Sequence, residues 1–357
     1  MRTTFLLVTI AAAVGALTYA LAGATRAAPI AAEVMSEPVP LELAATGLGA
    51  QADVDAAAEV AEVMGEAPEA VDAILATPML THPDFVSEVR RWVAFWETAP
   101  AQWFPEYLAR MASFEEIVDT TLAAHGLPWS LRYLPVIESG YSPTAVSKAS
   151  AVGLWQFMAH TASDFDIEIS TDVDDRRDPF VSTAAAADFL VELHERFGSW
   201  FLALAAYNAG PDRIEKLIER HAPDAERSDA LYWALRPYLP RETADFVPNL
   251  FGAIIVASDP EAHGYALPVP APFDFEAVPV LGRVSFDAAA RATGTTHAEI
   301  ARLNPEYVRG VTPGDEVVDL RVPPGRGQAF RDYFAALGGA GAVPSVPTDT
   351  RAGAPGR

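Results

Sequence analysis

The sequence has no cysteine among its 357 residues, which excludes disulfides, zinc–thiolate sites and thiol nucleophiles. It is also poor in positive charge, because 25 Lys and Arg stand against 48 Asp and Glu, a formal net charge of −23. Nucleic acids and anionic membrane surfaces attract Lys and Arg, so neither is an expected partner. A Gly-rich phosphate loop and a nucleophilic-serine motif are missing as well. His160, His194 and His221 show no metal-ligand spacing with carboxylates, so we expect no metal and no cofactor.

The first 24 residues have the features of an export signal. Arg2 precedes an uncharged stretch over residues 5–22, and the small residues 22–24 offer a cleavage site. The stretch is long for a signal peptide and near the short limit of a membrane span, so cleaved export and inner-membrane anchoring both stay open. We expect an exported protein of the periplasm or cell envelope. Residues 25–79, rich in Ala, Glu and Pro, are predicted to be a linker.

Residues 80–262 are predicted to form a mainly α-helical domain. Half of the chain is apolar, enough for one sizeable core and a smaller module. Apolar residues recur at helical spacing over 85–96, and further helices are expected over 184–197, 200–207 and 242–256. No strand pattern of comparable strength precedes residue 262, so the expected fold class is mainly α with one helical core.

A Pro-rich joint at 267–272 introduces a second unit, expected over 263–330. Its pattern predicts a strand at Val278–Val280, a helix at Phe286–Ala292, a second helix after the capping box that begins at Thr296, and a strand at Val317–Val322. This order indicates a small α+β module. Residues 331–357 are expected to be a flexible tail.

Glu138 is the strongest candidate for chemistry. It follows an apolar run, Leu131, Leu134, Val136 and Ile137, in the sequence Glu-Ser-Gly-Tyr-Ser-Pro. Burial disfavours an ionised carboxylate, so we expect the pKa of Glu138 to be raised and the group to serve as a general acid. The alternative is an ordinary surface glutamate near a helix end.

Two further motifs follow in order, Gly153-Leu154-Trp155-Gln156-Phe157 and Ala206-Tyr207-Asn208-Ala209-Gly210. The Gln156 amide suits the hydroxyl and acetamido groups of sugars, and Tyr207 with Asn208 places polar groups at a helix end. Each also has a purely structural interpretation: core aromatics with a loop-capping glutamine, and a helix C-cap.

Together the three motifs resemble the lysozyme-like lytic transglycosylases (glycoside hydrolase family 23), over roughly residues 82–258. The resemblance implies a lysozyme-like fold (goose-type, or SLT) and cleavage of the β-1,4 bond between N-acetylmuramic acid and N-acetylglucosamine in peptidoglycan strands. It further implies that Glu138 acts first as acid and then as base, forming a 1,6-anhydromuramic acid end. Ser139, Gln156, Tyr207, Asn208 and Phe246 are the substrate-binding residues by the same resemblance. Intramolecular attack by the muramyl 6-hydroxyl needs no second carboxylate.

Phe246 departs from the family pattern, which usually has a tyrosine there, and Tyr232 or Tyr238 could supply the missing hydroxyl. Two alternative functions remain. A hydrolytic muramidase would need a second carboxylate, for which Asp166, Asp172 and Asp174 are the candidates. A non-catalytic peptidoglycan-binding or scaffold protein would need none.

The C-terminal unit is similar to a degenerate LysM module. Residues 300–305 and 322–325 carry the similarity, and the usual opening Gly-Asp turn is missing. LysM modules bind N-acetylglucosamine chains, so the resemblance implies glycan targeting. A packing or spacer module is the alternative.

Overall fold

The computed structural model describes residues 72–98 and 103–337. The export signal or anchor expected at 1–24 and the expected linker up to residue 71 lie outside these residues. The described chain divides into two compact units. The first comprises the chain up to Asp166 together with Pro179–Ala271, and the second comprises Ile167–Asp178 together with the chain from Pro272.

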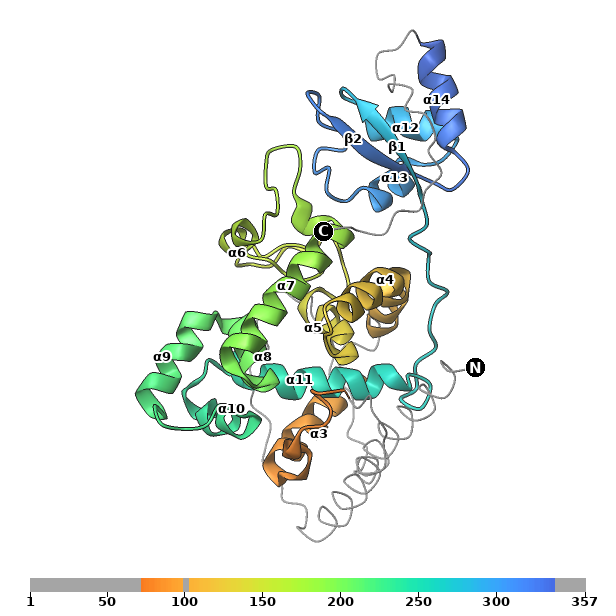
Figure 1. Ribbon diagram of the computed structural model, residues 1–357. Coiled ribbons are helices and arrows are strands. Elements are labelled where there is room, and N and C mark those ends of the chain that lie inside the picture. The colour runs from red at the N-terminus through yellow and green to blue at the C-terminus, as the bar shows by residue number, and fades with distance from the viewer. Residues whose placement is uncertain (1–71, 99–102, 338–357) are drawn as a thin grey trace. The chain divides into compact units, whose positions relative to one another are not determined.

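The first unit is helical (Figure 1). Its α-helices are α3 (Pro83–Thr98), α4 (Phe104–Ala124), α5 (Leu134–Ser139), α6 (Ala159–Asp164), α7 (Pro179–Phe197), α8 (Trp200–Ala209), α9 (Pro211–His221), α10 (Asp229–Leu235) and α11 (Arg241–Ser258), and 3-10 helices lie at Pro78–Thr81, Trp129–Tyr133 and Arg236–Tyr238. The mainly α class predicted from the sequence is confirmed.

Helix α11 is the central element of this unit and packs along α3 and α8 (Figure 1). Phe85, Phe201 and Phe251, one from each helix, form a buried aromatic cluster with ring centroids 5.3 to 5.7 Å apart. Gly252 permits the close approach, because a Cβ there would lie 2.7 Å from the Cβ of Trp92 on α3. The helix continues through Pro248.

The second unit contains a two-stranded antiparallel sheet, β1 (Glu276–Leu281) and β2 (Val317–Val322), in the register Glu276↔Val322. Helices α12 (Phe286–Thr293), α13 (His297–Leu303) and α14 (Gly327–Ala336) accompany it, and a 3-10 helix lies at Asp175–Arg177. Ser285 and Thr296 cap α12 and α13 with their hydroxyls, and Thr296 accepts from the Glu299 amide as the predicted capping box requires. The strand–helix–helix–strand order predicted from the sequence is present.

Three expected boundaries differ from the structure. The linker was expected to reach residue 79, but Ile74 is fully buried and the Asp72 carboxylate accepts from the amide and hydroxyl of Ser130, both at 2.8 Å. The first unit was expected to end at 262, but Tyr265 is buried and its hydroxyl donates to the Trp96 carbonyl. The tail was expected from 331, yet α14 continues to Ala336 and buries Phe334. In each case the folded part extends further than the composition of the segment predicts, because a few of its residues are buried or hydrogen-bonded to the rest of the unit.

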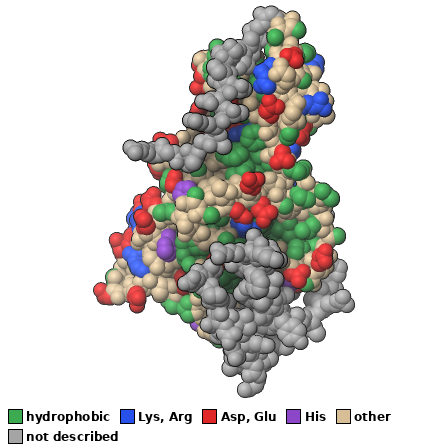
Figure 2. Space-filling view, turned by 45° about the vertical axis from the view of Figure 1, so that its right-hand side comes forward, with side chains coloured by type: hydrophobic (Ala, Val, Ile, Leu, Met, Phe, Trp, Pro, Cys, Tyr) green, Lys and Arg blue, Asp and Glu red, His purple; other side chains and the backbone are tan. Residues whose placement is uncertain are grey.

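Acidic side chains are scattered over the face shown in Figure 2 rather than gathered into one patch. Within the described ranges, no helix has the length and apolar character needed to cross a bilayer.

Candidate functional site

Glu138 lies in the last turn of the short helix α5. Gly140 ends the helix in the left-handed conformation, with φ of 58°, and a Cβ there would lie 2.7 Å from the ring of Tyr107. Only glycine allows this approach of the backbone to α4. Arg110 completes the contact, since its Nε donates to the Gly140 carbonyl at 2.8 Å. The turn after Glu138 is therefore fixed by α4.

The carboxyl group of Glu138 is protonated near neutral pH. Burial raises its pKa to about 8, and the negative charge of Glu242 adds to the shift. The residue as a whole keeps partial exposure, whereas burial of its carboxyl group is the main cause of the raised pKa. The raised pKa predicted from the apolar run is present.

Ser139 joins the first motif to the second. Its hydroxyl donates to the Leu154 carbonyl at 2.8 Å and accepts from the Ser142 amide at 3.2 Å. The oxygen is thus held in place between α5 and the loop of the second motif. Its observed role is to position that loop beside Glu138.

The second motif, Gly153–Phe157, contains two buried aromatic residues and one residue in a strained backbone conformation. Trp155 and Phe157 are core residues, and the Trp155 indole donates to Thr183 of α7 at 3.0 Å. Gln156 adopts a positive φ of 53°, and its amide nitrogen donates to the Gly153 carbonyl at 2.8 Å. A non-glycine residue in this conformation costs free energy that the surroundings must offset, as happens often at functional sites. The structural interpretation of the two aromatics is therefore right, and the amide donors of Gln156 are partly used by its own loop.

Tyr207 joins the third motif to the second. Its hydroxyl, at the end of α8, donates to the Trp155 carbonyl at 2.6 Å. Burial and then the charge of Glu138 raise the pKa of Tyr207 well above its ordinary value. Tyr207 and Glu138 therefore lie close enough to interact electrostatically.

Asn208 joins the third motif to the start of α11. Its amide oxygen accepts from the Thr243 hydroxyl at 2.7 Å, and its amide nitrogen lies 3.4 Å from Glu242 Oε1. These contacts bring the first turn of α11 next to the end of α8. Glu242, exposed at the surface, is the carboxylate that acts electrostatically on Glu138. The sequence alone gives no signal for Glu242, because nothing in the spacing from 138 to 242 indicates proximity.

Phe246 is a core residue, and the two candidate substitute tyrosines have other partners than Glu138. Phe246 is 6% exposed in the core. The Tyr232 hydroxyl donates to the carbonyls of Thr243 and Ala244, and Tyr238 stacks on His221 with ring centroids 3.8 Å apart. Neither of these contacts directs a hydroxyl to Glu138. Tyr207 is the tyrosine that interacts with it.

Two of the acids nominated as a second carboxylate are engaged in the second unit. Asp172 pairs with Arg283 at 2.9 Å, and Asp174 pairs with Arg176 at 2.8 Å. Asp166 is exposed, and it is the last residue before the chain enters the second unit at Ile167. Between residues 72 and 337, leaving out 99–102, no group of three acidic or histidine side chains could hold a metal ion.

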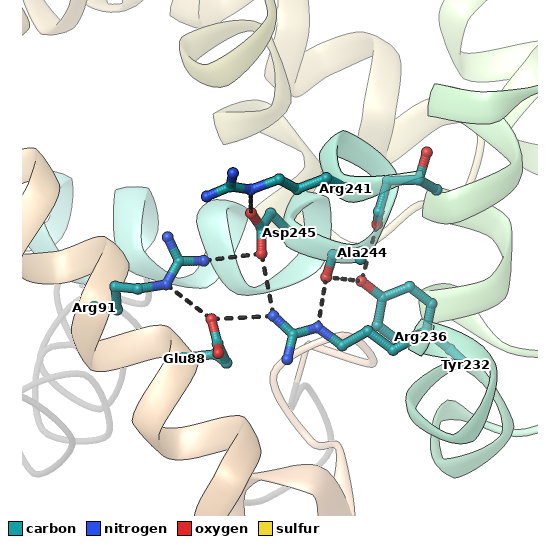
Figure 3. Close-up of polar contacts among 8 residues, drawn as sticks. Glu88, Arg91, Tyr232, Arg236, Arg241, Ala244 and Asp245 are labelled. Carbon is teal, nitrogen blue, oxygen red and sulfur yellow. Dashed lines mark hydrogen bonds and ion pairs between the residues drawn. The ribbon is translucent and has the colours of Figure 1, made fainter. Parts of the chain in front are cut away.

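A pocket of about 780 Å³ opens in the first unit between α3, α10 and α11. Figure 3 shows the ion pairs in its wall: Glu88 and Asp245 each accept from both Arg91 and Arg236, at 2.8 to 3.1 Å. Arg241 approaches Asp245 at 3.9 Å, and the Arg236 Nε donates to the Ala244 carbonyl at 3.1 Å. These contacts connect α3 to the first turn of α11, the turn that carries Glu242.

Two protein-family descriptions match this chain. The transglycosylase SLT domain matches residues 119–229, which include all three motifs, and the LysM-like domain of lytic transglycosylase MltD matches residues 274–338. Phe246 and Glu242 lie beyond the end of the first match.

One of two similar curated proteins is named as a lytic transglycosylase. The chain is 34% identical over 143 residues to membrane-bound lytic murein transglycosylase D of Escherichia coli (strain K12), covering 40% of this chain and 31% of that protein. It is 38% identical over 111 residues to an Alteromonas sp. (strain M-1) protein named for tributyltin chloride resistance, covering 31% of this chain and 54% of that one.

The chain thus spans about a third and about half of the length of these two relatives. Among solved structures, the 70 kDa soluble lytic transglycosylase of Escherichia coli is 20% identical, with a TM-score of 0.36, over 59% of this chain and 34% of that chain. From the family matches, the chain contains a transglycosylase SLT domain followed by a LysM-like domain of the lytic transglycosylase MltD type.

Proposed function

We propose that the protein is a lytic transglycosylase that cleaves the β-1,4 bond between N-acetylmuramic acid and N-acetylglucosamine in peptidoglycan strands. The observation that carries the proposal is Glu138, a carboxyl whose pKa is raised to about 8 within a site formed by three motifs and α11. The matched SLT domain and the transglycosylase named among the relatives support the same substrate class.

In the first step, Glu138 donates its proton to the glycosidic oxygen as the bond from C1 to that oxygen breaks. Because its pKa is about 8, the group carries this proton throughout the neutral range. A negative charge on Glu242 would stabilise the positive charge that develops at C1.

In the second step, the Glu138 carboxylate removes the proton of the muramyl 6-hydroxyl, and that oxygen forms a bond to C1. The product is a 1,6-anhydromuramic acid end, and Glu138 is protonated again by the proton of the 6-hydroxyl, while the proton it donated stays on the departing sugar. Burial and the neighbouring Glu242 both disfavour the ionised form of Glu138, so they make it a stronger base in this step.

We assign substrate binding to Ser139, Gln156, Tyr207, Asn208 and Phe246. Ser139 and Tyr207 hold the second motif against Glu138, and each hydroxyl oxygen can still accept a hydrogen bond from a sugar. Asn208 presents its amide between Glu242 and Thr243. Phe246, buried in α11, supports the site by packing.

A hydrolytic muramidase is the second candidate, and one observation favours it. Glu242 supplies the carboxylate that the sequence motifs lacked, and as a base it could activate a water molecule. The end group of the product separates the two reactions.

The test is mass spectrometry of fragments released from purified peptidoglycan. We expect ends that are lighter by one water than reducing ends, as the anhydro product requires. Reducing ends would instead establish a hydrolytic muramidase. If the wild type releases no more than the Glu138→Gln variant, the protein is a non-catalytic binding or scaffold protein.

The substrate also implies an envelope location, and one relative is named as membrane-bound. We propose that residues 1–24 direct export, with anchoring through residues 5–22 if they are not cleaved. Fractionation of cells with an antibody to the second unit tests this: recovery in the cytoplasm would contradict it.

A further inference from the structure

The chain leaves the first unit after Asp166 and re-enters it at Pro179, and the twelve residues between, Ile167–Asp178, belong to the second unit. We call these residues the crossing segment. The structure shows that its partners are in the LysM-like domain, more than a hundred positions away.

The backbone of the crossing segment pairs with residues 306–308. The Asp174 amide donates to the Glu306 carbonyl at 2.9 Å, and the Val308 amide donates to the Asp172 carbonyl at 3.1 Å. Val173 lies between them in an antiparallel bridge with Tyr307. Its side chain is 7% exposed and belongs to the core that includes Val278 and Leu320. The segment therefore binds in the way that a short strand adds to a sheet edge, through main-chain hydrogen bonds and the buried side chain of Val173.

Charged contacts reinforce the same pairing. Asp172 accepts from Arg283 at 2.9 Å and from Arg309 at 3.4 Å. Asp178 pairs with Arg321 of β2, which also lies 3.2 Å from Glu306. These arginines come from the connection between β1 and α12, the connection between α13 and β2, and β2 itself.

The two ends of the crossing segment lead directly to elements of the candidate site. It follows α6, which begins two residues after the Gly153–Phe157 motif, and it precedes α7, which carries Thr183. Thr183 accepts the hydrogen bond of the Trp155 indole at 3.0 Å. Fixing both ends of the segment therefore limits the movement of the loop that presents Gln156.

We propose that the LysM-like domain is a receptor for the crossing segment of its own chain, and that by holding it the domain braces the Gln156 loop. The surface formed by residues 283 and 306–309 is then occupied by residues 172–174 and is not available to a glycan strand. The effect on the Gln156 loop rests on the proposed function of the first unit, whereas the binding of the crossing segment by the LysM-like domain does not.

The test is hydrogen–deuterium exchange of the whole protein and its Asp172→Arg variant. The new arginine would face Arg283 and Arg309, so like charges replace an attraction. We expect several-fold faster exchange in peptides covering 167–178 and 304–311, and also in those covering 150–158. Adding Arg283→Asp to Asp172→Arg should restore much of the protection. Asp274→Arg, an exposed position in the same unit, is the control for net charge and should change neither region.

Val173→Ala is the milder variant if Asp172→Arg fails to fold, since it removes apolar contact without adding charge. It should speed exchange in the same three regions and lower the turnover of peptidoglycan, with unchanged exchange in α3. Unchanged exchange over 304–311 in both variants would overturn the receptor role. Faster exchange there with no change over 150–158 would overturn the brace. These readouts hold even if the wild type has no activity, so failure of the proposed function is seen separately.

Discussion

Glu242 raises the pKa of Glu138, although the two residues are about a hundred positions apart in the sequence. An isolated buried carboxyl already resists ionisation, and a second carboxylate at the edge of the same site opposes it further. The acid form of Glu138 is the active form in the first step. Activity should therefore be present below pH 8 and decline as the pH rises through about 8.

The first prediction concerns Glu242→Gln. Removing its charge lowers the pKa of Glu138, so the alkaline decline of the pH–rate profile moves to lower pH, while burial keeps the pKa above the ordinary value of 4.5. Initial rates of peptidoglycan solubilisation from pH 5 to 9 measure this. Glu261→Gln, an exposed acid on the same unit, is the control. An unmoved profile would show that Glu242 does not act on Glu138.

The second prediction concerns the tyrosine hydroxyl beside the acid. Tyr207→Phe removes the bond to the Trp155 carbonyl, and a lost hydrogen bond of this kind costs about 1 kcal/mol of stability. We expect activity to fall by about tenfold or more, since 1.4 kcal/mol of transition-state stabilisation corresponds to that factor. Phe246→Tyr should bring no gain, because position 246 is buried in α11. A gain with Phe246→Tyr and no loss with Tyr207→Phe would place the necessary hydroxyl at 246.

At the scale of helices and strands, the sequence predicts those elements that depend on apolar spacing and on capping residues. The helices α3, α7, α8 and α11 and both strands follow from apolar spacing and from caps such as Ser199. The short helices α6 and α10 and the terminal α14 were not predicted, since few turns give too little periodicity. The three motifs identified Glu138, yet the contact of Asn208 with Glu242 depends on how α8 meets α11, which no local pattern encodes.

The third prediction concerns the network that connects α3 to α11. Asp245→Ala leaves Arg91 and Arg236 without one of their two carboxylates, while Glu88 still pairs with both. Asp245 is 9% exposed, and losing one partner of a largely buried charged group costs about 1–3 kcal/mol. Denaturant unfolding followed by tryptophan fluorescence measures the loss. Asp212→Ala, in an exposed pair with Arg196, should cost less than about 1 kcal/mol. Equal losses would contradict a special role for the network.

For the whole molecule, the charged cluster of the second unit makes stability depend on pH. Glu306 is 4% exposed, and burial raises its pKa to about 8. Arg321 opposes this shift, whereas Asp178 and Asp175 add to it. The unfolded chain ionises Glu306 near its ordinary value of 4.5, so between pH 4.5 and 8 the folded state holds the extra proton. The free energy of unfolding therefore falls as pH rises across this window.

The fourth prediction is that Glu306→Gln removes much of this fall, so that the stability of the second unit relative to the wild type is higher at pH 8 than at pH 5. All seven tryptophans lie in the first unit, so their fluorescence does not report the second one. Hydrogen exchange over residues 317–334 at the two pH values, corrected for the intrinsic rate, is the suitable measurement. Glu316→Gln, at an exposed position, should keep the wild-type dependence. If the stability of the Glu306→Gln variant changes with pH as steeply as that of the wild type, another group causes the pH dependence.

The crossing segment also has a consequence for the order of folding. Its ionic partners lie 111 to 143 residues further along the chain, so it is synthesised long before β2 exists. Non-local pairing of this kind forms late, because a long loop must close before any contact offsets the lost entropy. The helices of the first unit can assemble around α11 while residues 167–178 still lack their partners. The Gln156 loop would then reach its final rigidity only when the described part of the second unit from Pro272 onward has folded.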